Sequence, residues 1–152
     1  MAFAKILVCV DGSESSAKAA DHAIEMAKKH DAQLIALNVV VSPLGYAYSP
    51  GAFGFRATPS AISEILQAAK NEARKWLDQI GNKAAAQGVR FRAEIVESPT
   101  STVAAIVDYA ETNKIDLIVT GTKGRSGFKK LLLGSVASGV ATYASCPVMI
   151  AK

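Results

Sequence analysis

The sequence has few of the residues that metal sites and disulfide frameworks require. It contains two cysteines and two histidines among 152 residues. Cys9 and Cys146 lie in separate apolar segments and form no C-x-x-C pair, so we expect both to pack as small apolar side chains without a disulfide. His22 and His30 show no partner pattern. Because a zinc site needs several convergent ligands, we expect structural or solvent-facing roles for both histidines and no metal site.

Long apolar runs are also missing, and we expect no secretory leader. The apolar runs are far shorter than the roughly 20 residues of a membrane-spanning helix, and residues 1–5 lead directly into a strand pattern. We therefore expect a cytoplasmic protein with no membrane contact. The composition, 50% hydrophobic and 20% charged, is typical of a globular chain. The length suits a single domain over residues 1–152.

Two widespread phosphate-binding signatures are absent. The chain has no G-x-x-x-x-G-K-[S/T] segment, because Lys129 follows Phe128 rather than a glycine, and it has no G-x-G-x-x-G segment. Their absence argues against a P-loop enzyme and against a Rossmann dehydrogenase.

The positive charges are mostly dispersed. The net charge is +4, and most lysines and arginines stand near acidic residues, so we expect no nucleic-acid partner. The exception is a basic cluster without an acidic neighbour, formed by Lys123, Arg125, Lys129 and Lys130. Phosphate groups are the natural partner of such a cluster, and a solvated basic turn is the alternative.

Strand and helix patterns alternate along the chain. Strands are expected at 6–10, 34–41, 89–96, 115–120 and 147–151. Helices are expected at 13–30, 60–87, 101–113 and 135–144, the first capped by Ser13. This alternation predicts an α/β fold, an open parallel five-stranded sheet of Rossmann-like type with helices on both faces.

Helical spacing marks the faces that should pack on the sheet. The inner residues of the first helix are Ala17, Ala20, Ile24 and Ala27. The second helix has an apolar stripe formed by Ile62, Ile65, Leu66, Ala69, Ala73, Trp76, Leu77 and Ile80. Because the single tryptophan falls in this stripe, we expect it in the core rather than against a ligand.

The most distinctive segment follows the fourth predicted strand. Gly121, Gly124, Gly134 and Ser135 have the spacing G-x2-G-x9-G-S. Glycines allow backbone N–H groups to approach an anion, and a helix that begins near Ser135 offers unpaired N–H donors and a partial positive charge. The segment therefore predicts a phosphate-binding cradle. The glycines alone would also suit an ordinary solvated loop.

This spacing resembles the motif of the nucleotide-binding branch of the universal stress protein family. The resemblance spans nearly the whole chain and is strongest at residues 5–13, 116–121 and 145–150, whereas residues 42–87 match only in pattern. Two positions differ from the family: Asn38 stands where members often have histidine, and Ser98 stands near a position where they have glycine. These differences concern details of the pocket.

The resemblance implies the strand order 3-2-1-4-5, with a crevice between the first and fourth strands. Ligands of open α/β sheets bind at such a switch point. Residues 11–13 end the first strand and residues 121–124 end the fourth, so the two distinctive loops meet there. The resemblance further implies an ATP-binding stress-response or regulatory homodimer, with Mg²⁺ or Mn²⁺ as a candidate companion ion. The nearly uncharged edge strand at 147–151 would pair with a second copy.

The resemblance also implies the binding residues. The ribose and phosphates would be held around Gly121, Thr122, Gly124, Arg125, Ser126, Gly134, Ser135 and Val136, with the Ser135 hydroxyl donating to a phosphate. Adenine would lie near Val10 and Val39, and backbone groups of Val39 would read its edge. Asp11 would face the ribose or a phosphate-bound cation. A turn or capping role is the alternative for Asp11, and a buried strand position is the alternative for Val39.

Three functional classes remain open at this point. The first is an ATP-binding regulatory protein. The second is a slow ATPase or nucleotidyl-transfer enzyme, in which Asp11 alone would orient water or metal because the motif has no evident general base. The third is a dimeric interaction module without a working nucleotide site, which the intact glycine spacing disfavours.

One long connection, residues 42–59, is rich in glycine, proline and aromatic residues. Connections of this length are usually functional or disordered. A lid formed by Tyr46, Tyr48, Phe53 or Phe55 over the nucleotide is one hypothesis, and a contact with a partner or plain disorder are the alternatives.

Overall fold

Five parallel strands form one sheet in the computed structural model, which describes residues 2–42, 58–123 and 133–152. The strands are β1 (Lys5–Cys9), β2 (Gln33–Val41), β3 (Phe91–Ser98), β4 (Leu117–Gly121) and β5 (Val148–Ala151). Their order is β3-β2-β1-β4-β5, and each neighbouring pair is parallel. The expected α/β class and strand order are confirmed.

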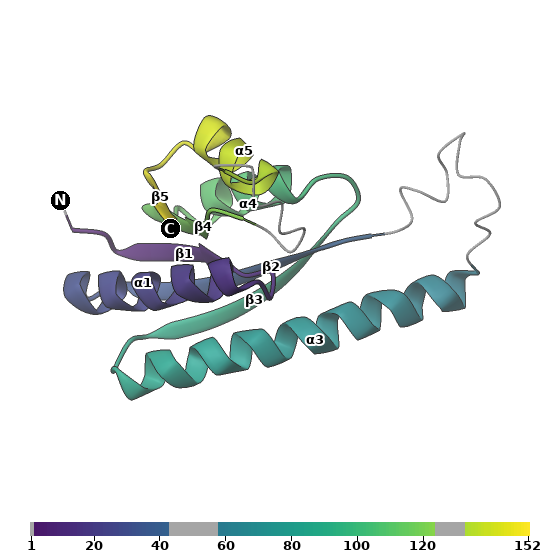
Figure 1. The fold of residues 1–152 in the computed structure, drawn as a ribbon, viewed down its shortest axis with the longest axis horizontal. Coiled ribbons are helices and arrows are strands. Elements are labelled where there is room, and N and C mark those ends of the chain that lie inside the picture. Colours follow the sequence, from purple (N-terminus) through teal and green to yellow (C-terminus); the bar gives the residue numbers. More distant parts are fainter. Residues whose placement is uncertain (1, 43–57, 124–132) are drawn as a thin grey trace.

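Helices cover both faces of this sheet. Within the described residues they are α1 (Glu14–His30), α3 (Pro59–Ala86), α4 (Thr102–Thr112) and α5 (Ser135–Tyr143). Figure 1 shows α1 and α3 on one side of the strands and α4 and α5 on the other. In β1, Ile6 and Val8 belong to the apolar cluster under α1 and α3, whereas Leu7 and Cys9 belong to the cluster under α4 and α5. Burial on both faces explains why β1 is continuously apolar.

The helix α1 begins at its expected cap and packs closely through small side chains. Ser13 Oγ accepts a hydrogen bond from Ser16 N at 3.1 Å. The buried residues of the helix are Ser16, Ala19, Ala20, Ala23, Ile24 and Ala27. The expectation that Ala17 faces the core is wrong, because Ala17 is exposed and Ser16 turns inward, where its hydroxyl accepts from Asp11 N.

The long helix α3 is buried through only part of its predicted stripe. Ala73, Leu77 and Ile80 are buried, and Trp76 packs partly buried against the same core. Ile65 is 51% exposed, contrary to expectation. Ile62 in the first turn of α3 is buried, so the predicted stripe is interrupted at Ile65 rather than lost over the whole start of the helix. None of the helices in the described parts of the chain is both long and apolar enough to cross a membrane.

The strands β3 and β4 begin two residues later than predicted, because the apolar residues expected at their starts close the preceding helices. Val89 N donates to Ala84 O at 3.0 Å, and Ile115 N donates to Ala110 O at 2.9 Å. Both side chains are buried, which gave them the appearance of strand residues in the sequence. The backbone of each is therefore used at a helix end rather than in the sheet.

Candidate functional site

A cavity of about 310 Å³ lies where the strand order reverses, at the carboxyl ends of β1 and β4. Every predicted binding residue that the structure describes lines it: Val10, Asp11, Val39, Gly121, Thr122, Gly134, Ser135 and Val136. The predicted residues Gly124, Arg125 and Ser126 lie outside the described residues, as do Lys129, Lys130 and the aromatic residues of the 43–57 segment. The cavity volume falls within the range of small-molecule sites, about 300–1,000 Å³.

Asp11 forms one wall of the cavity and also organises the turn that follows β1. Its Oδ1 accepts hydrogen bonds from Ser13 N at 2.9 Å and from Ser13 Oγ at 2.6 Å. The turn role considered for Asp11 is therefore real. It does not remove Asp11 from the cavity, because the same residue lines the space between β1 and β4.

Gly121 is required by the packing of α1 against the end of β4. A Cβ at this position would lie 2.7 Å from both the carbonyl carbon and the carbonyl oxygen of Ser15, far inside contact distance. Ser15 Oγ also accepts a hydrogen bond from Lys123 N at 3.2 Å. The first turn of α1 thus holds the end of β4 in place. The sequence predicts that Gly121 allows an anion to approach, but it does not reveal this steric requirement.

The helix α5 points its N-terminus at the cavity. Its N-cap residue is Gly134, and within the described residues no side chain caps this helix end. Side-chain caps are present on α1, α3 and α4, from Ser13, Thr58 and Ser101. The first N–H groups of any α-helix have no acceptor inside the helix. At α5 these donors, together with the partial positive charge of the helix end, are available to an anion in the cavity.

The connection between β4 and α5 is closed at its base. Gly134 N donates to Thr122 O at 2.5 Å, which joins the residue after β4 directly to the residue before α5. Lys123, one member of the predicted basic cluster, lines the cavity next to this closure. The predicted motif residues that are described are therefore brought together, although Thr122 and Gly134 are distant in sequence.

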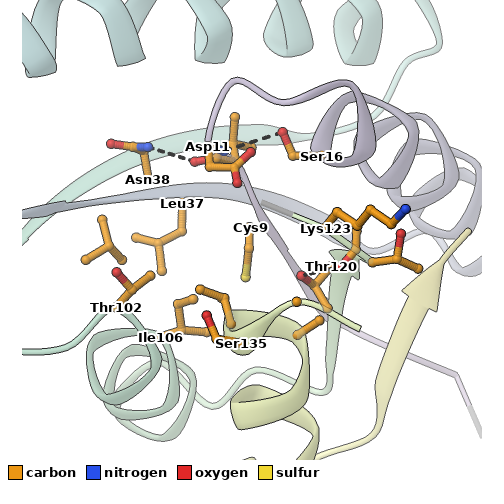
Figure 2. A pocket seen from close by; sticks show the side chains of 17 residues that line it. Cys9, Asp11, Ser16, Leu37, Asn38, Thr102, Ile106, Thr120, Lys123 and Ser135 are labelled. Atoms are coloured by element: carbon orange, nitrogen blue, oxygen red, sulfur yellow. Dashed lines mark hydrogen bonds between the residues drawn. The ribbon is translucent and has the colours of Figure 1, made fainter. Parts of the chain in front are cut away.

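Apolar side chains, among them Leu37 and Ile106, line another part of the cavity. The lining residues of the whole cavity that the site prediction did not include are Cys9, Ser16, Leu37, Asn38, Thr102, Ile106, Thr120, Lys123 and Ala137. Figure 2 shows Asp11 and Asn38 on one side of the cavity, Thr102, Ile106 and Ser135 on the other, and Cys9 between them. The contribution of α4 had no local signal in the sequence, because it depends on how the connection from β3 crosses the sheet.

Asn38 links the two strands beside this apolar part. The side chain is buried, and its Nδ2 donates to Val10 O at 2.7 Å. The amide therefore fixes the end of β1 relative to β2. This is the position at which the sequence differs from the common histidine of the family it resembles.

Cys9 offers no nucleophile to this site. Burial, with a smaller contribution from the carboxylate of Asp11, raises the pKa of the Cys9 thiol to about 12. The thiol is therefore neutral near pH 7 and packs as an apolar group. Among the described residues, no three histidine, cysteine, aspartate or glutamate side chains come together as metal ligands would.

Comparison with known proteins identifies the family. The sequence profile of the universal stress protein family matches residues 2–152. The chain belongs to this family. It is 39% identical over 151 residues to a universal stress protein of Methanocaldococcus jannaschii, an alignment that covers 99% of this chain and 82% of that protein.

Solved structures of universal stress proteins agree with this assignment. The universal stress protein UspA from Lactobacillus plantarum has a TM-score of 0.86 and 29% identity, with 100% of this chain and 99% of that chain covered. A universal stress protein solved in complex with cAMP has a TM-score of 0.72 and 27% identity, with 100% and 99% covered.

Proposed function

We propose that this universal stress protein binds an adenine nucleotide, specifically ATP, between β1 and β4 and acts as a nucleotide-dependent regulator or stress-response protein of the cytoplasm. The observation that carries the proposal is the N-terminus of α5, which has no side-chain cap among the described residues and meets the end of β4 at a cavity located at the switch point of the sheet. Helix N-termini with glycine at their approach are established phosphate-binding elements.

The phosphates are assigned to the α5 side of the cavity. Backbone N–H groups at Ser135 and Val136 would donate to phosphate oxygens, and the Ser135 hydroxyl would add a further donor. Lys123 supplies a positive charge beside them. We assign Gly124, Arg125 and Ser126 to the same role from the sequence motif.

The base is assigned to the apolar part of the cavity. Leu37, Val39 and Ile106 line it, and such walls suit the faces of an aromatic base. Backbone groups at Val39 and Val10 would read the base edge. The relative solved with cAMP, an adenine nucleotide, supports this choice of base.

Asp11 is assigned to the ribose or to a cation bound to the phosphates. Its two hydrogen bonds to Ser13 both use Oδ1. We therefore assign Oδ2 to a ribose hydroxyl, from which it would accept a hydrogen bond, or to Mg²⁺ or Mn²⁺, which it would bind as an oxygen ligand. No histidine lies among the described lining residues, and Asp11 is the carboxylate there, so we favour binding and regulation over ATP hydrolysis.

We also propose a homodimer formed through β5. This strand lies at one edge of the sheet, and its residues Val148, Met149, Ile150 and Ala151 carry no charge. Edge strands of this kind invite pairing with another chain. A nucleotide-dependent change in dimer or partner contacts would then be the regulatory output.

The decisive experiment changes the charge at the start of α5 and gives the helix a comparable side-chain cap in both variants. Asp and Asn are comparably good N-cap residues, and Gly is only a few tenths of a kcal/mol worse. Gly134→Asp and Gly134→Asn should therefore fold equally well, since the backbone at Gly134 has φ −67°, which suits any residue. Only the aspartate places a negative charge where we assign phosphate.

Calorimetric titration with ATP and Mg²⁺, after any co-purified nucleotide has been removed and identified by mass spectrometry, reads out the difference. We expect Gly134→Asp to bind at least about tenfold more weakly than Gly134→Asn, a loss of about 1.4 kcal/mol. Affinities in both variants equal to that of the wild type would place the phosphates elsewhere. A wild-type protein that binds no nucleotide would overturn the proposal and favour the interaction module.

A further inference from the structure

A second, smaller cavity lies behind the turn that presents Asp11. It has a volume of about 100 Å³ and is lined by residues 10, 12 and 13, by the first turn of α1, and by Trp76 and Ile80 of α3. Val10 and Ser16 line both this cavity and the larger one. The turn at residues 11–13 is therefore a thin wall with the proposed nucleotide site on one side and α3 on the other.

Trp76 supports this wall at Gly12. A Cβ on Gly12 would lie 2.5 Å from Cε2 and 2.7 Å from Cη2 of the indole, so the ring edge lies directly against the glycine backbone. Gly12 also has φ 85°, a conformation that favours glycine. Both the absence of a side chain at Gly12 and the presence of a large flat one at Trp76 are needed for this arrangement.

The contact continues from Gly12 to the carboxylate. Asp11 Oδ1 holds Ser13 N and Ser13 Oγ, and Ser13 Oγ in turn accepts from Ser16 N. These bonds make residues 11–13 and the start of α1 one connected unit. A displacement of Gly12 toward the small cavity would therefore move Asp11 relative to the larger one.

We propose that Trp76 is a positioning residue for nucleotide binding, which sets the place of Asp11 by supporting Gly12 from behind. This inference rests on the proposed function, because it concerns the affinity of the same site. The helix α3 contributes no residue to the larger cavity. In this proposal it nevertheless affects the geometry of that cavity, through Trp76. A smaller side chain at position 76 leaves the small cavity enlarged and the turn unsupported.

The first test needs no nucleotide and measures amide hydrogen exchange. Ser16 N is held by the cap residue Ser13 on the Asp11 side of the sheet, and Ala104 N is held in the same way by Ser101 on the other side. In Trp76→Phe we expect exchange at Ser16 to accelerate about threefold to tenfold relative to Ala104. The control is Leu77→Val, which changes the same core without touching Gly12. It should accelerate exchange at both amides equally or at neither.

The second test is a double-mutant cycle on ATP affinity. If Trp76 acts through Asp11, Trp76→Phe should weaken ATP binding about threefold to tenfold in the wild-type background and have almost no effect in the Asp11→Ala background. Leu77→Val should leave the affinity unchanged in both. Equal losses in the two backgrounds would show that Trp76 affects ATP binding independently of Asp11 and would overturn the inference.

The two tests separate the inference from the proposed function. Unchanged exchange at Ser16 in Trp76→Phe would overturn the role of Trp76 even if ATP binds tightly. A wild-type protein without ATP affinity would overturn the proposed function, while the exchange measurement would still decide whether Trp76 holds the turn.

Discussion

At the scale of single residues, Cys9 shows how the site can contain a cysteine and still lack a reactive one. Burial raises the pKa of its thiol from 9.0 to about 12. Between those values the unfolded chain has lost this proton and the folded chain retains it, so the unfolded state binds fewer protons and stability must fall as the pH rises. Well below pH 9 this group contributes no pH dependence.

The prediction is a steeper loss of stability in alkali for the wild type than for Cys9→Ala. Urea unfolding from pH 8 to pH 10.5 should give free energies of unfolding that decline faster in the wild type, because the variant lacks the group. The Cys9→Ala chain controls for lysine and tyrosine titration, which both proteins share. Parallel curves would mean that the thiol is not held in its neutral form.

At the scale of elements, the site depends on how closely α1 approaches β4. A Cβ at Gly121 would meet the backbone of Ser15, which cannot rotate away. Overpacking of this kind typically costs about 1–3 kcal/mol. We predict that Gly121→Ala lowers the free energy of unfolding by about this amount and weakens ATP binding, because α1 and β4 both line the site.

The matched control is Gly81→Ala in α3. Its Cβ would lie 2.9 Å from Cε1 of Phe91, a ring edge that can shift, and alanine gains about 1 kcal/mol over glycine inside a helix. Gly81→Ala should therefore unfold close to the wild-type midpoint and retain its ATP affinity. If Gly121→Ala were as stable as Gly81→Ala, the steric account of Gly121 would be wrong.

Element patterns also explain what the sequence could and could not predict. The order of strands and helices followed from apolar periodicity, and the cap at Ser13 from its position. The starts of β3 and β4 did not follow from this periodicity, because Val89 and Ile115 are buried residues of helix ends. The sequence did not reveal Thr102 and Ile106 as lining residues, because no fixed spacing in the chain marks which helix residues line a cavity across the sheet.

At the scale of the whole molecule, β5 forms one edge of the sheet. Ile118 N donates to Pro147 O at 3.0 Å, so Pro147 turns its carbonyl toward β4. Because backbone groups alternate along a strand, Val148 and Ile150 direct theirs toward the edge. These are the groups that would pair with a second copy of β5 in the proposed homodimer.

The last prediction is that one charge at this edge separates the copies without unfolding them. Lysine is a common means by which natural edge strands avoid pairing, so Ile150→Lys should be monomeric by light scattering, whereas wild type and Ile150→Val should be dimeric. Circular dichroism should show the same fold in all three. A monomeric wild type would contradict the dimer itself, and a dimeric Ile150→Lys would move its interface away from β5. If nucleotide regulates assembly, the dimer fraction of the wild type should also change with ATP, and Gly134→Asp should lose that response while Gly134→Asn keeps it.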